Sequence, residues 1–124
     1  MPKKAYPSIL PYPFSPAVRT GNLLFVSGQV GMRDGKTGQG IEEQTRFTME
    51  NIRDVLQQAG ASLEDVVKCT VFIKDMSLWA GMNEVYKSYF PKDAPARSSF
   101  GVTALALPEL LLEIECIAEV EGEG

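Results

Sequence analysis

The chain has 124 residues, of which 44% are hydrophobic and 23% charged, and its formal net charge is −4. This length fits one domain with a modest core, so we treat residues 1–124 as a single domain. An acidic chain without a basic run argues against a nucleic-acid partner, because such binding depends on Lys and Arg meeting phosphates. No apolar run is long enough to span a bilayer, so we expect no membrane partner.

The absence of histidine excludes several kinds of chemistry. Ser-His and Cys-His nucleophilic mechanisms and imidazole zinc sites all require this residue. The two cysteines, Cys69 and Cys116, both lie in apolar strand patterns, which indicates buried and inert thiols. Free thiols suit a reducing compartment, so we expect a cytoplasmic protein without a metal.

Proline dominates the beginning of the chain. Five of the eight prolines fall in residues 1–20, which predicts an extended N-terminal segment over 1–12. A short strand at 17–19 and a turn at 20–22 precede residues 23–30, whose nearly continuous apolar character predicts a buried strand.

A loop over residues 34–40 contains Gly35-Lys36-Thr37, which resembles part of a phosphate-binding loop. That motif requires a glycine five positions before its second glycine, and Val30 stands there instead. The segment is therefore interpreted as an ordinary loop.

Two helices and a strand follow. Residues 41–59 carry one apolar stripe with helical spacing, and Gly60 is a suitable stop. Residues 65–74 form a β-branched strand. A second helix begins at a predicted Ser77 cap and ends before Pro91, and within it we expect Asn83 to face solvent.

The last two strands are predicted over 97–103 and 111–120, with a frayed tail at 121–124. In the final strand, alternation separates an apolar side from a side that carries Glu113, Glu115 and Glu119. The element order β-β-α-β-α-β-β predicts an α+β fold, in which two helices pack on one face of a mixed sheet. A closed oligomer is the simplest cover for the other face.

Arg97 and Glu113 are the candidate catalytic residues. An arginine on a strand needs an anion, which could be Glu113, a helix carboxylate or a bound carboxylate or phosphate, unless the side chain is simply exposed. Glu113 could act in acid–base chemistry or could belong to a solvated sheet face. Ser27 could donate a hydrogen bond but has no base near it in the sequence.

Several blocks of sequence, in order, are similar to those of one protein family. They include Ser27-Gly28-Gln29 and Pro95-Ala96-Arg97-Ser98, and together they extend from about Pro11 to Ala118: residues 13–22, 24–29, 51–63, 65–68, 82–86, 95–98 and 113–118. The chain resembles the RidA (YjgF) family of reactive-intermediate or imine deaminases.

This resemblance implies a chorismate-mutase-like fold and a homotrimer with a central β-barrel and sites at the subunit interfaces. It implies hydrolysis of reactive enamines and imines, such as 2-aminoacrylate and 2-iminopropanoate, to 2-keto acids and ammonia, without a cofactor. The expected partner is thus a small imino or keto acid. By the same resemblance, Arg97 would hold the substrate carboxylate and Glu113 the attacking water. The pocket would be lined by Phe14, Ser27, Asn83 and Ser99.

Three features depart from the family pattern. Phe14 replaces the usual Tyr, Ser99 replaces a common Cys, and the segment from Gly101 to Leu112 is one residue longer. Two alternatives therefore stand beside the deaminase. One is a module that binds small carboxylates without turnover. The other is an endoribonuclease or translation inhibitor, which the missing histidine and the negative charge disfavour.

Overall fold

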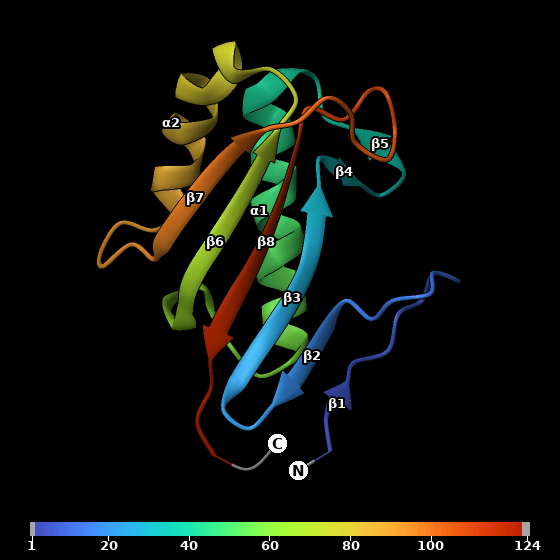
Figure 1. The fold of residues 1–124 in the computed structure, drawn as a ribbon, viewed down its shortest axis with the longest axis vertical. Helices are drawn as coiled ribbons and strands as arrows, with labels where there is room; N and C mark the ends of the chain where they lie inside the picture. Colours follow the sequence, from blue (N-terminus) through green and yellow to red (C-terminus); the bar gives the residue numbers. More distant parts are fainter. Residues whose placement is uncertain (1, 123–124) are drawn as a thin grey trace.

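A six-stranded mixed sheet is the framework of the molecule. The computed structural model describes residues 2–122, and its sheet has the strand order β1-β2-β3-β8-β6-β7 (Figure 1). Only β6 and β7 run parallel. The strands are β1 (Lys4–Ala5), β2 (Ala17–Thr20), β3 (Leu23–Val30), β6 (Val66–Ile73), β7 (Ala96–Gly101) and β8 (Leu112–Glu119).

Two helices, α1 (Gly40–Gln58) and α2 (Trp79–Tyr89), cover one face of this sheet, the far side in Figure 1. The predicted α+β fold and the order of its main elements are therefore confirmed. The structure adds the short strand β1 and a small hairpin, β4 (Met32–Arg33) with β5 (Lys36–Thr37), inside the segment expected to be a loop. Among residues 2–122, no helix has the length and apolar character needed to cross a membrane.

The start of the second helix differs from the prediction that Ser77 caps it. Asp75 has the capping role instead, because its carboxylate accepts a hydrogen bond from the Ser77 backbone N–H at 2.9 Å. A 3-10 turn, η2 (Met76–Leu78), leads from this cap into α2. The preference of Asp for capping positions equals that of Ser, so the sequence alone did not separate the two residues.

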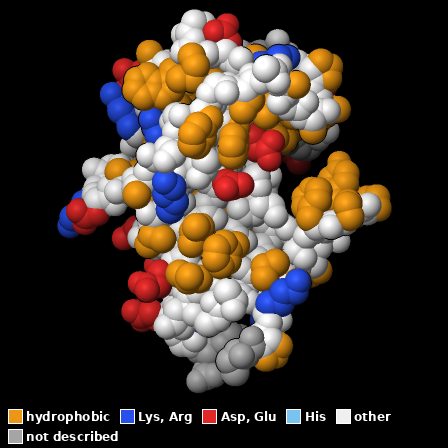
Figure 2. All heavy atoms as spheres, in the orientation of Figure 1, with side chains coloured by type: hydrophobic (Ala, Val, Ile, Leu, Met, Phe, Trp, Pro, Cys, Tyr) orange, Lys and Arg blue, Asp and Glu red, His pale blue; other side chains and the backbone are white. Residues whose placement is uncertain are grey.

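The apolar composition of strand β3 suggested a strand buried throughout, but the structure buries only part of it. Its first residues alternate, with Leu24 and Val26 in the core and Leu23 and Phe25 about 40% exposed. The exposed set lies on the sheet face opposite the helices, because Phe25 pairs with Ile117, on the side of β8 that carries the glutamates. Figure 2 shows apolar side chains gathered over this open face, with acidic groups among them.

Gln44 on α1 ties the helix to two loops. Its side-chain amide donates to the Gly38 and Glu109 carbonyl oxygens, and its Oε1 accepts from the Leu111 N–H at 2.8 Å. The side chain is 2% exposed, so water cannot replace these bonds. Gln44 thereby fixes the long segment that leads into β8.

We expect Gln44→Ala to lower the free energy of unfolding by about 1–3 kcal/mol, because buried backbone groups lose their partners. Chemical denaturation followed by circular dichroism measures this change. Gln58→Ala, at an exposed position near the end of the same helix, is the matched control and should change stability by less than about 0.5 kcal/mol. Equal effects of the two substitutions would contradict the assigned role of Gln44.

Candidate functional site

Arg97 lies on the edge strand β7 and points toward α2. Its register partner on β6 is Cys69, which is buried under the helices, so the Arg97 side chain leaves the sheet on the helix-covered face. The guanidinium carbon lies 4.8 Å from the centre of the Tyr86 ring and 5.7 Å from that of Trp79. Two aromatic side chains of α2 therefore position the charge.

No carboxylate neutralises this arginine within residues 2–122. The ion pairs of that region join Arg33 to Asp54, Arg53 to Glu50 and Lys87 to Glu84. Of the alternatives open from the sequence, a salt bridge to Glu113 or to a helix carboxylate is therefore not formed in this region. Stacking on aromatic faces uses the flat surface of the guanidinium and leaves its N–H donors at the edge, where a planar carboxylate can bind.

Asn83 and Ser99 lie on the same side of the sheet as Arg97. Asn83 is four residues after Trp79 and three before Tyr86, so the three share one face of α2. Contrary to the expectation of a solvent-facing residue, its Oδ1 is buried, and it has no hydrogen-bond partner in the described chain. Ser99 follows Arg97 by two residues on β7 and shares its orientation. We call Arg97, Ser99, Asn83, Trp79 and Tyr86 the arginine cluster.

Glu113 lies on the opposite, open face of the sheet. It pairs with Phe72 on β6 and Val30 on β3, and its carboxyl group covers Gly28. A β-carbon at Gly28 would come within 2.8 Å of the Glu113 Cδ, so only glycine leaves room for this position. Burial, and then the charge of Glu115, raise the pKa of Glu113 above its ordinary value.

Ser27 and Phe14 lie on the β3 side of the sheet. The Ser27 hydroxyl donates to the Ser15 carbonyl at 2.6 Å, which fastens the N-terminal segment to β3. Phe14 is 56% exposed and stacks on Tyr12, with ring centres 5.2 Å apart. Ser27 thus has a structural bond, and Phe14 belongs to a segment that extends away from the sheet (Figure 1). We call Glu113 and Gly28, which lie in direct contact, the glutamate cluster.

A single chain does not bring Arg97 and Glu113 together. They leave the sheet on opposite faces, from strands separated by β6, and they are offset by three register positions, which is about 10 Å along the strands. The predicted residues therefore do not form one site within a single chain. Sequence reasoning missed Trp79 and Tyr86, since it counted them only as apolar positions of a helix. It also did not assign a role to Gly28, whose place in Ser27-Gly28-Gln29 was the available signal.

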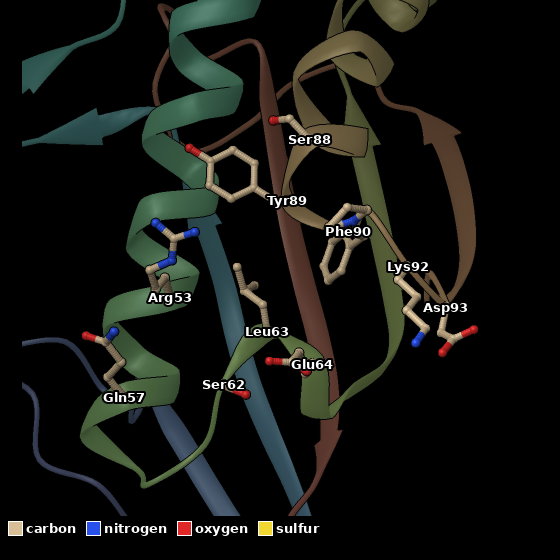
Figure 3. Close-up of a pocket in the computed structure, with 11 residues that line it drawn as sticks. Arg53, Gln57, Ser62, Leu63, Glu64, Ser88, Tyr89, Phe90, Lys92 and Asp93 are labelled. Atoms are coloured by element: carbon tan, nitrogen blue, oxygen red, sulfur yellow. The ribbon is translucent and has the colours of Figure 1, made fainter.

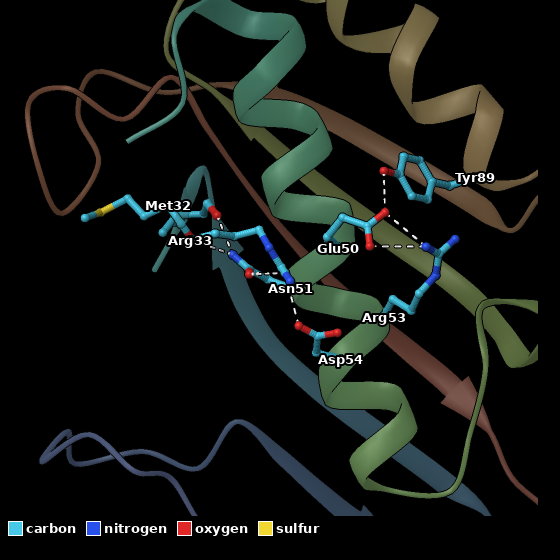
Figure 4. A network of polar contacts seen from close by, with 8 residues as sticks. Met32, Arg33, Glu50, Asn51, Arg53, Asp54 and Tyr89 are labelled. Carbon is cyan, nitrogen blue, oxygen red and sulfur yellow. Dashed lines mark hydrogen bonds and ion pairs between the residues drawn. The ribbon is translucent and has the colours of Figure 1, made fainter. Parts of the chain in front are cut away.

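A cavity of about 560 Å³ lies elsewhere, and none of the predicted site residues lines it. Figure 3 shows it between the second half of α1, the turn after it and the end of α2. On its α1 side, Glu50 accepts bonds from Arg53 and from the Tyr89 hydroxyl (Figure 4). Burial and this bond raise the pKa of Tyr89 to about 12. These groups are mutually satisfied, which favours a structural role.

The comparisons with known proteins decide the family. Residues 6–120 match the sequence family described as Endoribonuclease L-PSP. The chain is 47% identical over 113 residues to a RutC family protein of Pyrococcus horikoshii, with 88% of each chain covered. It is 39% identical to the mouse 2-iminobutanoate/2-iminopropanoate deaminase over 89% of this chain and 82% of the mouse protein.

The chain belongs to the RidA (YjgF) family. A solved member of the YjgF/YER057c/UK114 family from Mycobacterium tuberculosis superposes with a TM-score of 0.86 at 37% identity, covering 96% of this chain and 100% of the other. The family resemblance read from the ordered sequence blocks is thereby confirmed, together with its fold. The roles of individual residues stay predictions.

We expect Gly28→Ala to displace the Glu113 carboxyl group with little loss of stability, because the crowded atoms belong to the end of a flexible side chain. The pKa of Glu113, followed by carboxyl-carbon NMR, should then move toward its ordinary value. In a Glu113→Gln background, Gly28→Ala should leave the other carboxyl resonances unchanged. A Glu113 pKa unaltered by Gly28→Ala would contradict the close packing of these residues.

Proposed function

We propose that this chain hydrolyses reactive enamine and imine intermediates of the 2-aminoacrylate and 2-iminopropanoate type, giving 2-keto acids and ammonia. The observation that carries the proposal is Arg97, a partly buried guanidinium that is held by two aromatic rings and has no anionic partner among residues 2–122. The names of the mouse relative and of the Arabidopsis Reactive Intermediate Deaminase A support the same reaction class.

The substrates of this class share a small carboxylate next to an electrophilic carbon. In the proposal, Arg97 binds that carboxylate in a bidentate manner and fixes the orientation of the C=N bond. The unpaired Asn83 Oδ1 can accept a hydrogen bond from the substrate nitrogen. These contacts position the substrate, which in its protonated imine form is already electrophilic and needs no covalent nucleophile.

Glu113 supplies the proton transfers. Its carboxylate accepts a proton from water as the oxygen attacks the imine carbon, and returns that proton to the nitrogen. The C–N bond then breaks, the C=O bond forms, and the hydroxyl proton passes to the departing ammonia, which is released as ammonium. An enamine first gains a proton at its terminal carbon to become the imine. The raised pKa of Glu113 makes it a better base than an ordinary carboxylate.

Since one chain holds Arg97 and Glu113 on opposite faces, the proposed site requires two subunits. Arg97, Asn83 and Ser99 would come from one copy, and Glu113 with Gly28 from its neighbour. The apolar open face, with Phe25 and Phe100 42% and 53% exposed, supports a closed homotrimer around a central barrel. In this proposal the assembly completes the site.

A coupled assay, in which an amino-acid oxidase or a 2-aminoacrylate-forming enzyme supplies the unstable substrate, tests the reaction. We expect Arg97→Ala and Glu113→Gln each to reduce keto-acid release at least about a hundredfold. Unfolding and refolding an equal mixture of the two variants should restore about one quarter of the wild-type activity, because half of the arginine clusters and half of the glutamate clusters are intact.

Each variant refolded alone is the control for that experiment. If the mixture stays inactive while the wild type is active and refolds, Arg97 and Glu113 do not act from different subunits. Wild-type protein that binds pyruvate without accelerating deamination would favour a binding module instead. RNA cleavage that is lost in Arg97→Ala would favour the endoribonuclease.

The pH dependence tests the base. Glu113 must be deprotonated to accept a proton from water, so kcat/KM should fall as the pH decreases through its pKa. Because that pKa is raised, the fall should begin at a higher pH than for an ordinary glutamate. The Gly28→Ala substitution should move the pH at which kcat/KM falls to a lower value. If kcat/KM does not decrease at low pH, Glu113 does not act as the base.

A further inference from the structure

The two free cysteines face each other across the sheet. Cys69 on β6 is the direct antiparallel partner of Cys116 on β8, and both side chains point into the core, where they are 1% and 3% exposed. The α-carbons of directly opposed residues in antiparallel strands lie about 4.5–5.5 Å apart. Disulfide-bonded cysteines span about 4.4–6.8 Å, so the backbone already has the spacing of a disulfide.

The state of each sulfur influences the other. Burial raises the pKa of the Cys116 thiol, and the adjacent Cys69 sulfur raises it further. Burial also raises the pKa of Cys69, although Tyr86 and Arg97 partly oppose this effect. Both groups are therefore protonated at neutral pH, so a thiolate must form by loss of a proton before either sulfur reacts.

The cysteine pair lies next to the arginine cluster. Cys116, Cys69 and Arg97 occupy one register row across β8, β6 and β7. In the described part of the chain, the buried Tyr86 hydroxyl has no oxygen or nitrogen partner and lies beside the Cys69 thiol. The Tyr86 ring lies 4.8 Å from the Arg97 guanidinium carbon. The Tyr86 side chain thus links Cys69 to Arg97, so a covalent change at Cys69 can move Arg97 through Tyr86.

We propose that Cys69 and Cys116 are a redox-active pair that closes to an intramolecular disulfide and thereby alters the Arg97 position through Tyr86. With hydrogen peroxide as the oxidant, one cysteine loses its proton and its sulfur attacks a peroxide oxygen to become a sulfenic acid, while the displaced hydroxide takes up that proton and leaves as water. The second sulfur then attacks this sulfenic sulfur and releases a second water molecule. The pair loses two protons and two electrons, and the peroxide is reduced.

Mass spectrometry of the intact protein tests the disulfide. After hydrogen peroxide treatment, denaturation and thiol alkylation, we expect a chain that has lost two hydrogen atoms and carries no alkyl group on Cys69 or Cys116, and dithiothreitol should restore both thiols. Tryptic mapping identifies the bridged peptides in the wild-type protein, so this result does not depend on the folding of a variant. Two alkylated cysteines, or a bridge between chains, would overturn the proposal.

Trp79, the single tryptophan, reports on the link to Arg97 independently of turnover. We expect oxidation to shift the Trp79 emission of the wild type and dithiothreitol to reverse the shift. The Cys116→Ala variant keeps Cys69 but cannot close the bridge, so the same peroxide treatment should leave its emission unchanged. A disulfide that forms without any emission change would overturn the link to the arginine cluster.

Discussion

The stacking of Arg97 on Tyr86 and Trp79 is the interaction on which the proposed chemistry depends. A contact of this kind contributes about 0.5–2 kcal/mol, enough to position a guanidinium without consuming its hydrogen-bond donors. An ion pair would position the same group but would occupy those donors. The aromatic rings therefore leave the charge available to a ligand, and they connect α2 to the edge of the sheet.

The sheet distributes the remaining groups between its two faces. Strand alternation places Glu113 on the open face, over Gly28, and places Arg97 under the helices. The same alternation exposes apolar side chains around Glu113, which are unfavourable in water and favour association between copies. The intersubunit site that we propose would cover this apolar face and would also bring an Arg97 side chain to a Glu113 side chain.

Much of the fold could be predicted from the sequence because its periodicities are local. The stripe of α1 and the alternation of β8 correspond to the buried residues observed, and the glycine after α1 ends it with a positive φ. The prediction was wrong where two residues offered the same local signal, as for Asp75 and Ser77, and where apolar composition concealed alternation, as in β3. Asn83 was misplaced because nothing in its sequence context shows that its amide is covered.

The sequence by itself determined the family, the element order and the residues available for chemistry, since ordered motifs and hydrophobic periods are properties of the chain. Only the tertiary structure decided which of those residues meet. Strand pairing put Cys69 opposite Cys116 and Arg97 beside them, and it separated Arg97 from Glu113. Register joins residues that are distant in sequence, and the pleat sends successive side chains to opposite faces, so proximity depends on the assembled sheet.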